Sequence, residues 1–153
     1  MQVILVQHGE AKTEADDPER SLTERGTKAV QRVAAWASQV GVQVAQIRHS
    51  GKRRAEQTAE ILAERLHPAG GVIAVGGLKP NDDVSPLAEA LANETETVML
   101  VGHLPFLGRL VSLLVARDRT MEVVRFRNAG LVCLGRREGQ WSVESVVPPE
   151  LVP

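Results

Sequence analysis

Short, largely apolar runs occur at three points along the chain, and a polar segment follows each of them. The runs span Val3–Val6, Val44–Ile47 and Val98–Val101. Aliphatic runs of this length, rich in β-branched residues, are typical of strands buried on both faces of a sheet. The polar segments after them begin at Gln7, Arg48 and Gly102. We therefore expect three buried strands that carry polar residues at their carboxyl ends.

Between these runs, apolar residues recur at helical spacing. One helix is expected to begin after Thr23, a suitable N-cap, and to end before Gly41. A second is expected from about Lys52 to Leu66, with Pro68 ending it. The other expected elements are an edge strand between Gly71 and Gly76, a short helix through Leu91, a helix over Phe106–Ala116 with Pro105 in its first turn, and late strands at about Gly130–Gly135 and Gln140–Val146.

The alternation of strands with helices predicts an α/β fold, a three-layer sandwich with a mostly parallel central sheet flanked by helices. With 153 residues and 43% hydrophobic content, the chain suits one domain over residues 1–153. The carboxyl ends of parallel strands meet at one edge of a sheet. The three polar segments are therefore expected to converge on one pocket.

Composition narrows the classes of function. A net charge of −1 and only four aromatic residues argue against binding of nucleic acid or of an anionic membrane. The longest apolar stretch, Leu110–Ala116, is too short to span a bilayer, and the amino terminus does not resemble a signal peptide. The single cysteine, Cys133, lies in an apolar run and is expected in the core. We expect a cytoplasmic protein, with a monomer as the simplest state.

The candidate chemistry lies in the three converging segments, which contain His8, Arg54 and His103. Two histidines and an arginine near helix N-termini suit an anion, and phosphate fits best because a guanidinium binds its oxygens bidentately. A neutral imidazole is a good nucleophile near pH 7, and a protonated one stabilises negative charge. Metal binding by the two histidines lacks a supporting carboxylate–histidine spacing. We expect neither a metal nor another cofactor.

Four motifs occur in order along nearly the whole chain. They are His8-Gly9-Glu10 after the first strand, Leu22 to Gly26 at a helix start, Ser50 followed by Arg54 to Thr58, and Val101 to Pro105. Together they resemble the histidine phosphatase superfamily, with its phosphoglycerate-mutase-like fold, and most closely its SixA-type phosphohistidine phosphatases. The resemblance implies that His8 is the nucleophile, that Arg54 grips phosphate oxygens and that His103 is the second histidine of the phosphate pocket.

Gln7, Gly9 and Ser50 in the same motifs are the expected substrate-binding residues. Gln7 stands where the superfamily has arginine, and loss of one charge-assisted contact costs about 1.5–3 kcal/mol, or roughly tenfold to a hundredfold in rate. The glycine after His8 is expected to let a ligand approach the backbone closely. A second departure is Gly51, where proline is common in the family.

Three carboxylates are candidates for the general acid: Asp82 or Asp83, which lie in a polar loop, and Glu10. The sequence does not choose between them. Phosphohistidine needs little acid assistance because the conjugate acid of its leaving imidazole has a pKa near 6.5, whereas an alkoxide requires a proton. We therefore expect a phosphohistidine phosphatase that acts on a phosphorylated protein. The alternatives are a small-molecule phosphomonoesterase, or a phospho-ligand-binding pseudoenzyme, which Gln7 makes credible.

Overall fold

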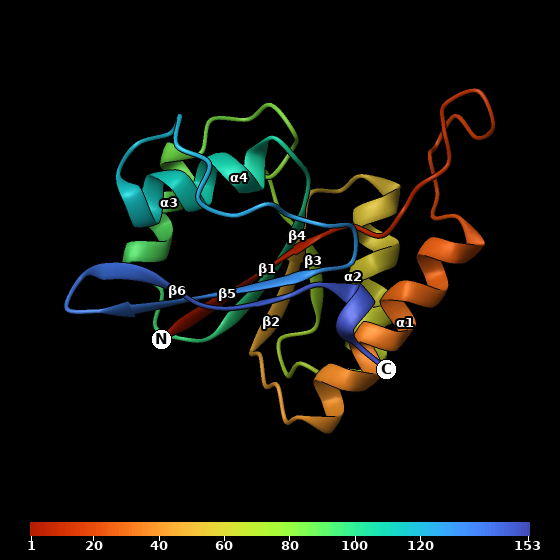
Figure 1. The fold of residues 1–153 in the computed structure, drawn as a ribbon, viewed down its shortest axis with the longest axis horizontal. Coiled ribbons are helices and arrows are strands. Elements are labelled where there is room, and N and C mark those ends of the chain that lie inside the picture. The colour runs from red at the N-terminus through yellow and green to blue at the C-terminus, as the bar shows by residue number, and fades with distance from the viewer.

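The computed structural model describes residues 1–153 and contains a six-stranded sheet with helices on both faces (Figure 1). The strands are β1 Gln2–Gln7, β2 Gln46–His49, β3 Val72–Ala74, β4 Val98–Gly102, β5 Leu131–Arg137 and β6 Gln140–Val147. The helices are α1 Glu24–Gln39, α2 Arg53–Leu66, α3 Ser85–Ala92 and α4 Phe106–Val111, followed by a π-helical turn at Ser112–Ala116 and a 3-10 turn at Pro149–Leu151.

The sheet has the order β3-β2-β4-β1-β5-β6. The first four strands in this order are parallel, while β5 pairs antiparallel with both β1 and β6. The α/β class with a mostly parallel sheet is therefore confirmed. The register places Gln7 of β1 opposite Gly102 of β4, and His49 of β2 opposite Val101. The ends of β1, β2 and β4 consequently lie at one edge of the sheet.

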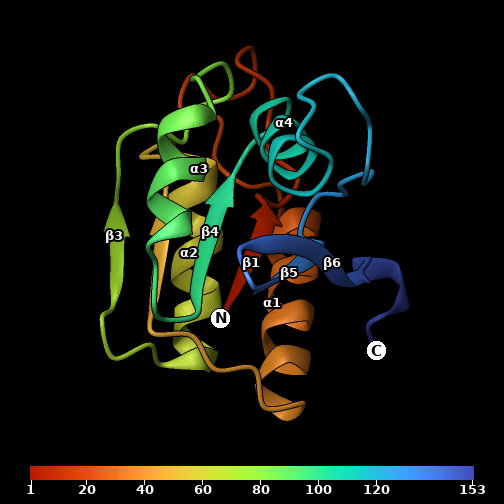
Figure 2. The ribbon, with the colours of Figure 1, turned by 90° about the vertical axis from the view of Figure 1, so that its left-hand side faces the viewer.

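Helices cover both faces of this sheet (Figures 1 and 2). An apolar core lies between the sheet and the helices on each face. Ile4 and Val6 of β1 pack with α1 and α2, whereas Val3 and Leu5 pack with α3 and α4. Successive side chains of a strand point to opposite faces, so a strand covered on both sides must be apolar throughout. This accounts for the unbroken run at the start of the chain.

Local boundaries agree closely with the sequence, with two exceptions. Thr23 is the N-cap of α1, and its side chain accepts a hydrogen bond from the N–H of Gly26 at 2.9 Å. Strand β2 lies about two residues later than expected because its ladder with β4 begins at Gln46. Pro105 precedes α4 as its N-cap rather than lying in the first turn. None of the helices combines the length and apolar character needed to cross a bilayer.

Candidate active site

The predicted convergence of strand ends is present in the structure. His8 follows β1 and His103 follows β4, and their ring centroids lie 5.0 Å apart. The N–H of His8 donates to the carbonyl of Gly102 at 3.1 Å, which extends the β1–β4 pairing to the histidine. Both side chains are almost fully buried, at 9% and 1% exposure. The sheet therefore places two imidazoles side by side at its carboxyl edge.

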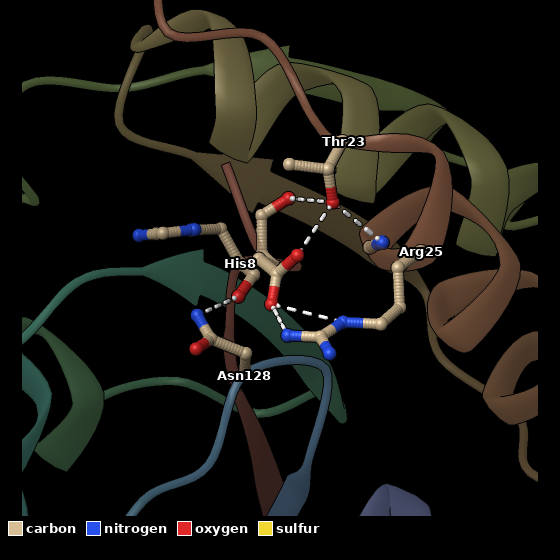
Figure 3. Close-up of polar contacts among 6 residues, drawn as sticks. His8, Thr23, Arg25 and Asn128 are labelled. Carbon is tan, nitrogen blue, oxygen red and sulfur yellow. Dashed lines mark hydrogen bonds and ion pairs between the residues drawn. The ribbon is translucent and has the colours of Figure 1, made fainter. Parts of the chain in front are cut away.

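The hydrogen bonds of His8 determine which ring nitrogen carries its proton. Nδ1 lies 2.7 Å from the carbonyl oxygen of Gly9, which can only accept, so Nδ1 carries the hydrogen. The lone pair is therefore on Nε2. The backbone is held as well, because Asn128 donates to the His8 carbonyl at 2.9 Å (Figure 3) and the Gly9 N–H donates to Thr58 Oγ1 at 3.0 Å.

His103 is held by Ser50 at the end of β2. Its Nε2 lies 2.5 Å from Ser50 Oγ, and the same oxygen accepts the N–H of Lys52 at 3.3 Å. A hydroxyl can both donate and accept, so Ser50 Oγ can bind Nε2 in either tautomer of neutral His103. The Nδ1 of His103 is buried and has no hydrogen-bond partner in the protein.

Burial dominates the ionisation of both imidazoles. Burial, with smaller contributions from Arg54 and Arg20, lowers the pKa of His8 to about 4, although the hydrogen bond to the Gly9 carbonyl opposes them. Burial also lowers the pKa of His103 to about 3, with smaller contributions from His8 and Arg54. Both rings are thus neutral at pH 7 in the free pocket, so protonation of a histidine depends on the bound ligand. A bound phosphate dianion would favour protonation.

Arg54, the second residue of α2, supplies a positive charge that forms no ion pair, although the charge of Glu14, in the same cavity, acts on it and favours its ionised form. Its side chain is half-buried, its Nε is buried without a hydrogen-bond partner, and it forms no ion pair. Burial and the neighbouring charge of Arg20 lower the pKa of Arg54, yet a guanidinium stays ionised at neutral pH. The nearby Arg53 differs because Glu56 pairs with it at 2.6 Å.

Arg20 is the residue that sequence reasoning missed. It lines a cavity of about 430 Å³ with Lys52 and Arg54, and it has no ion-pair partner. Its backbone is left-handed, with φ 51°, and its Nε donates to the Lys12 carbonyl at 3.1 Å, which leaves both Nη groups free. No local pattern distinguishes this arginine in a charged loop. Only the return of the loop, where Ala11 bridges Leu22, brings it to the site.

Gln7 and Arg54 line different cavities. Its side chain lines a separate cavity of about 610 Å³ with Arg25 and Asn128, and its Oε1 is buried without a partner. Neighbouring residues at a strand end point to opposite sides, so Gln7 diverges from His8. Gln7 thus lines a different cavity from Arg54, and its part in substrate binding stays a prediction.

Two glycines have structural reasons that the sequence did not reveal. A Cβ at Gly9 would lie 2.8 Å from a methyl carbon of Val30, and the Gly9 N–H is occupied by Thr58. Close packing against α1, rather than approach of a ligand, thus requires glycine here, which corrects the sequence expectation. Gly51 has φ +88° in the turn after Ser50. Proline cannot adopt this conformation, which explains the departure from the family pattern.

The candidate acids are engaged elsewhere. Glu10 accepts hydrogen bonds from Thr23 at 2.9 Å and from Arg25, whose side chains lie together in Figure 3. The hydrogen bond from Arg25, and to a lesser extent that from Thr23, holds the pKa of Glu10 below its usual range. This carboxylate therefore links α1 to the end of β1 and is poorly suited to donate a proton. Asp82 accepts the Lys79 N–H at 2.9 Å within its own loop and lines neither cavity. Asp83 forms an ion pair with Arg119, with its Oδ1 lying 3.5 Å from Arg119 Nη1.

No group of three or more histidine, cysteine, aspartate or glutamate side chains is placed to hold a metal ion. The site is instead a pair of neutral imidazoles beside Arg54, Arg20 and Lys52. Such an arrangement can bind a phosphoryl group and offer it a nitrogen nucleophile.

Comparison with known proteins gives a consistent result. The model of the histidine phosphatase superfamily (branch 1) matches residues 3–78. The phosphohistidine phosphatase SixA of Escherichia coli (strain K12) is 34% identical over 117 residues, which are 73% of each chain. The solved structure of the protein histidine phosphatase SixA complexed with tungstate has a TM-score of 0.86 at 27% identity over 97% of each chain. A putative α-ribazole-5′-P phosphatase of E. coli shares the fold, with a TM-score of 0.80 at 17% identity over 97% of this chain and 98% of that one.

Proposed function

Because the chain belongs to the histidine phosphatase superfamily and is a phosphatase, we propose that it hydrolyses phosphohistidine on a protein through a covalent intermediate at His8. The observation that carries this proposal is the neutral His8 Nε2 lone pair near Arg54 and Arg20, neither of which forms an ion pair. A site with unpaired cations and a neutral nucleophile is suited to a phosphoryl dianion.

The proposed reaction has two steps. In the first, Nε2 of His8 attacks phosphorus and the bond from phosphorus to the substrate's imidazole nitrogen breaks. The imidazole departs as a neutral group because its other ring nitrogen already carries a proton. The Gly9 carbonyl, 2.7 Å from Nδ1, stabilises the positive charge that develops on the ring. In the second, water attacks phosphorus, the P–Nε2 bond breaks and neutral His8 returns. Arg54 and Arg20 bind the phosphoryl oxygens, and His103 is the second histidine of the pocket, positioned by Ser50.

The absence of a placed acid supports a phosphoramidate substrate. The conjugate acid of a departing imidazole has a pKa near 6.5, so the imidazole leaves readily, whereas an alkoxide needs a positioned proton donor. Glu10 is tied to Arg25, and Asp82 binds its own loop. The similarity to a phosphohistidine phosphatase agrees with this choice.

We expect kcat/KM to decrease from a phosphohistidine peptide to p-nitrophenyl phosphate and then to phosphoserine, because the leaving groups become progressively more basic. Phosphate release from equal concentrations of the three compounds measures this order. Phosphoserine hydrolysis as fast as that of phosphohistidine would contradict the proposal and favour a small-molecule phosphomonoesterase. No turnover of any of the three compounds would also contradict it.

Replacing Arg20 with glutamine is expected to lower kcat/KM by roughly tenfold to a hundredfold, the range for one charge-assisted contact to phosphate. In this proposal Arg20 supplies charge at the site, while Gln7 faces the other cavity. Arg53→Gln is the matched control, since it removes an arginine of the same cavity that already pairs with Glu56. Equal losses in the two variants would show that Arg20 has no specific role.

A further inference from the structure

The cavity beside Gln7 is lined by residues that adjoin both histidines of the candidate active site along the chain. It begins one residue before His8, at Gln7, and reaches Leu104, one residue after His103. We call it the arginine cleft and define it by Arg25, Arg32, Leu104, Phe126, Arg127 and Glu150. Its volume of about 610 Å³ exceeds the volume of the cavity at Arg54. A substrate with its phosphoryl group at His8 would extend naturally into this space.

One wall of the cleft is a helix, and the other is an irregular segment that is hydrogen-bonded to the backbone of His8. One wall is a stripe of α1, where Arg25, Ala29 and Arg32 lie on the same helix face because they are four and three residues apart. The opposite wall is the segment that contains Phe126 and Arg127. The next residue of that segment, Asn128, donates to the His8 carbonyl at 2.9 Å. The cleft and the nucleophile are therefore held in a constant relative position.

The charges of the cleft are unbalanced. Arg25 pairs with Glu10, but Arg32 and Arg127 form neither an ion pair nor a side-chain hydrogen bond to any other residue. Glu150 is the one carboxylate of the lining that is left unpaired. Two free cations thus face one free anion in a chain whose net charge is −1. A local positive site on such a chain attracts acidic ligands.

The cleft also offers apolar contact near its centre. Leu104 is 42% exposed, which is unusual for a leucine next to a buried histidine, and Phe126 is half-buried. Arginines beside exposed aromatic and aliphatic side chains are typical of protein interfaces, where they bind carboxylates bidentately. A compact phosphorylated metabolite would not need this second cavity, whereas a peptide chain that continues past its phosphorylated residue would fill it.

We propose that the arginine cleft binds an acidic stretch of the protein substrate adjacent to the phosphorylated histidine. This inference rests on the proposed function. Carboxylates of the substrate pair with Arg32 and Arg127, and an apolar side chain between them packs on Leu104. The cleft thereby selects the protein that is dephosphorylated, while the chemistry stays with His8.

The test uses two peptides of equal length, each with one phosphohistidine. Glutamates flank the phosphohistidine in one peptide and glutamines in the other. The wild-type protein is expected to prefer the acidic peptide in kcat/KM, and the Arg32→Gln/Arg127→Gln variant to lose about five- to tenfold on that peptide alone. Its rate on p-nitrophenyl phosphate should stay within twofold. Raising the ionic strength should weaken the preference.

Two further variants separate local from general charge effects. Glu150→Gln removes the opposing carboxylate and should strengthen binding of the acidic peptide. Arg137→Gln removes a charge at the exposed β5–β6 hairpin, which extends away from α1 in Figure 1, and should change nothing. An equal effect of Arg137→Gln, or no preference of the wild-type protein for the acidic peptide, would overturn the proposal.

Failure of the proposed function would look different. The affinities of the same variants for the two peptides are measured by fluorescence anisotropy, which does not depend on turnover. Absent hydrolysis with an acidic preference that disappears in the double variant would refute the phosphatase proposal and support the cleft. Hydrolysis of both peptides with equal affinities in all variants would support the phosphatase and refute the cleft.

Discussion

Replacing His8 with alanine is expected to lower the turnover of phosphohistidine by at least about 10³-fold, because the nucleophile that forms the intermediate is lost. The fold should survive, since His8 belongs to neither apolar core and its structural contacts are made by its backbone. Those contacts are the bond from the His8 N–H to Gly102 and the bond from Asn128 to the His8 carbonyl. The measurement is kcat/KM together with the melting temperature of both proteins.

Trapping of the covalent intermediate tests whether the phosphoryl group is transferred to His8. Brief incubation with radiolabelled substrate should leave a base-stable, acid-labile label on the wild-type protein and none on His8→Ala. His67→Asn is the matched control, because His67 lies on the surface at the end of α2 and should label normally. A residual rate above about a tenth of the wild-type rate, or label on the alanine variant, would remove His8 from the nucleophile role.

Arg54→Lys is expected to have the next largest effect, a loss of about 10²–10³-fold in kcat/KM. The substitution keeps the positive charge but removes the planar fork that can bind two phosphoryl oxygens at once. Arg54 is held in place because Thr58 Oγ1 donates to its carbonyl at 2.8 Å within α2, while its Nε has no protein partner. The loss should fall more on kcat than on KM if the contact strengthens in the transition state.

Binding of inorganic phosphate gives an independent readout for Arg54. A ligand that binds only the folded state raises the melting temperature, so phosphate should stabilise the wild-type protein more than Arg54→Lys. Arg53→Lys, at the neighbouring position and paired with Glu56, should behave like the wild-type protein in both assays. Equal phosphate stabilisation and equal rates in all three proteins would place Arg54 outside the phosphate pocket.

Sequence alone determined the features that depend on local patterns. The unbroken apolar run before Gln7 predicted a strand covered on both faces, and its residues do alternate between the two cores. Thr23 predicted the start of α1, since capping depends on only a few neighbouring residues. The meeting of His8 with His103 was also predictable, because parallel strands place their carboxyl ends together.

Tertiary structure decided the features that depend on direction and on contacts between distant residues. Sequence could not show that Gln7 lines a different cavity from Arg54, or that Arg25 forms an ion pair with Glu10. Both features depend on how α1 crosses the end of β1. Sequence could not identify Arg20 as a residue of the site, because Arg20 lies in a loop with many charged residues. Only the return of that loop places Arg20 in the same cavity as Arg54. Sheet order and loop closure join residues far apart along the chain, and no local periodicity records such contacts.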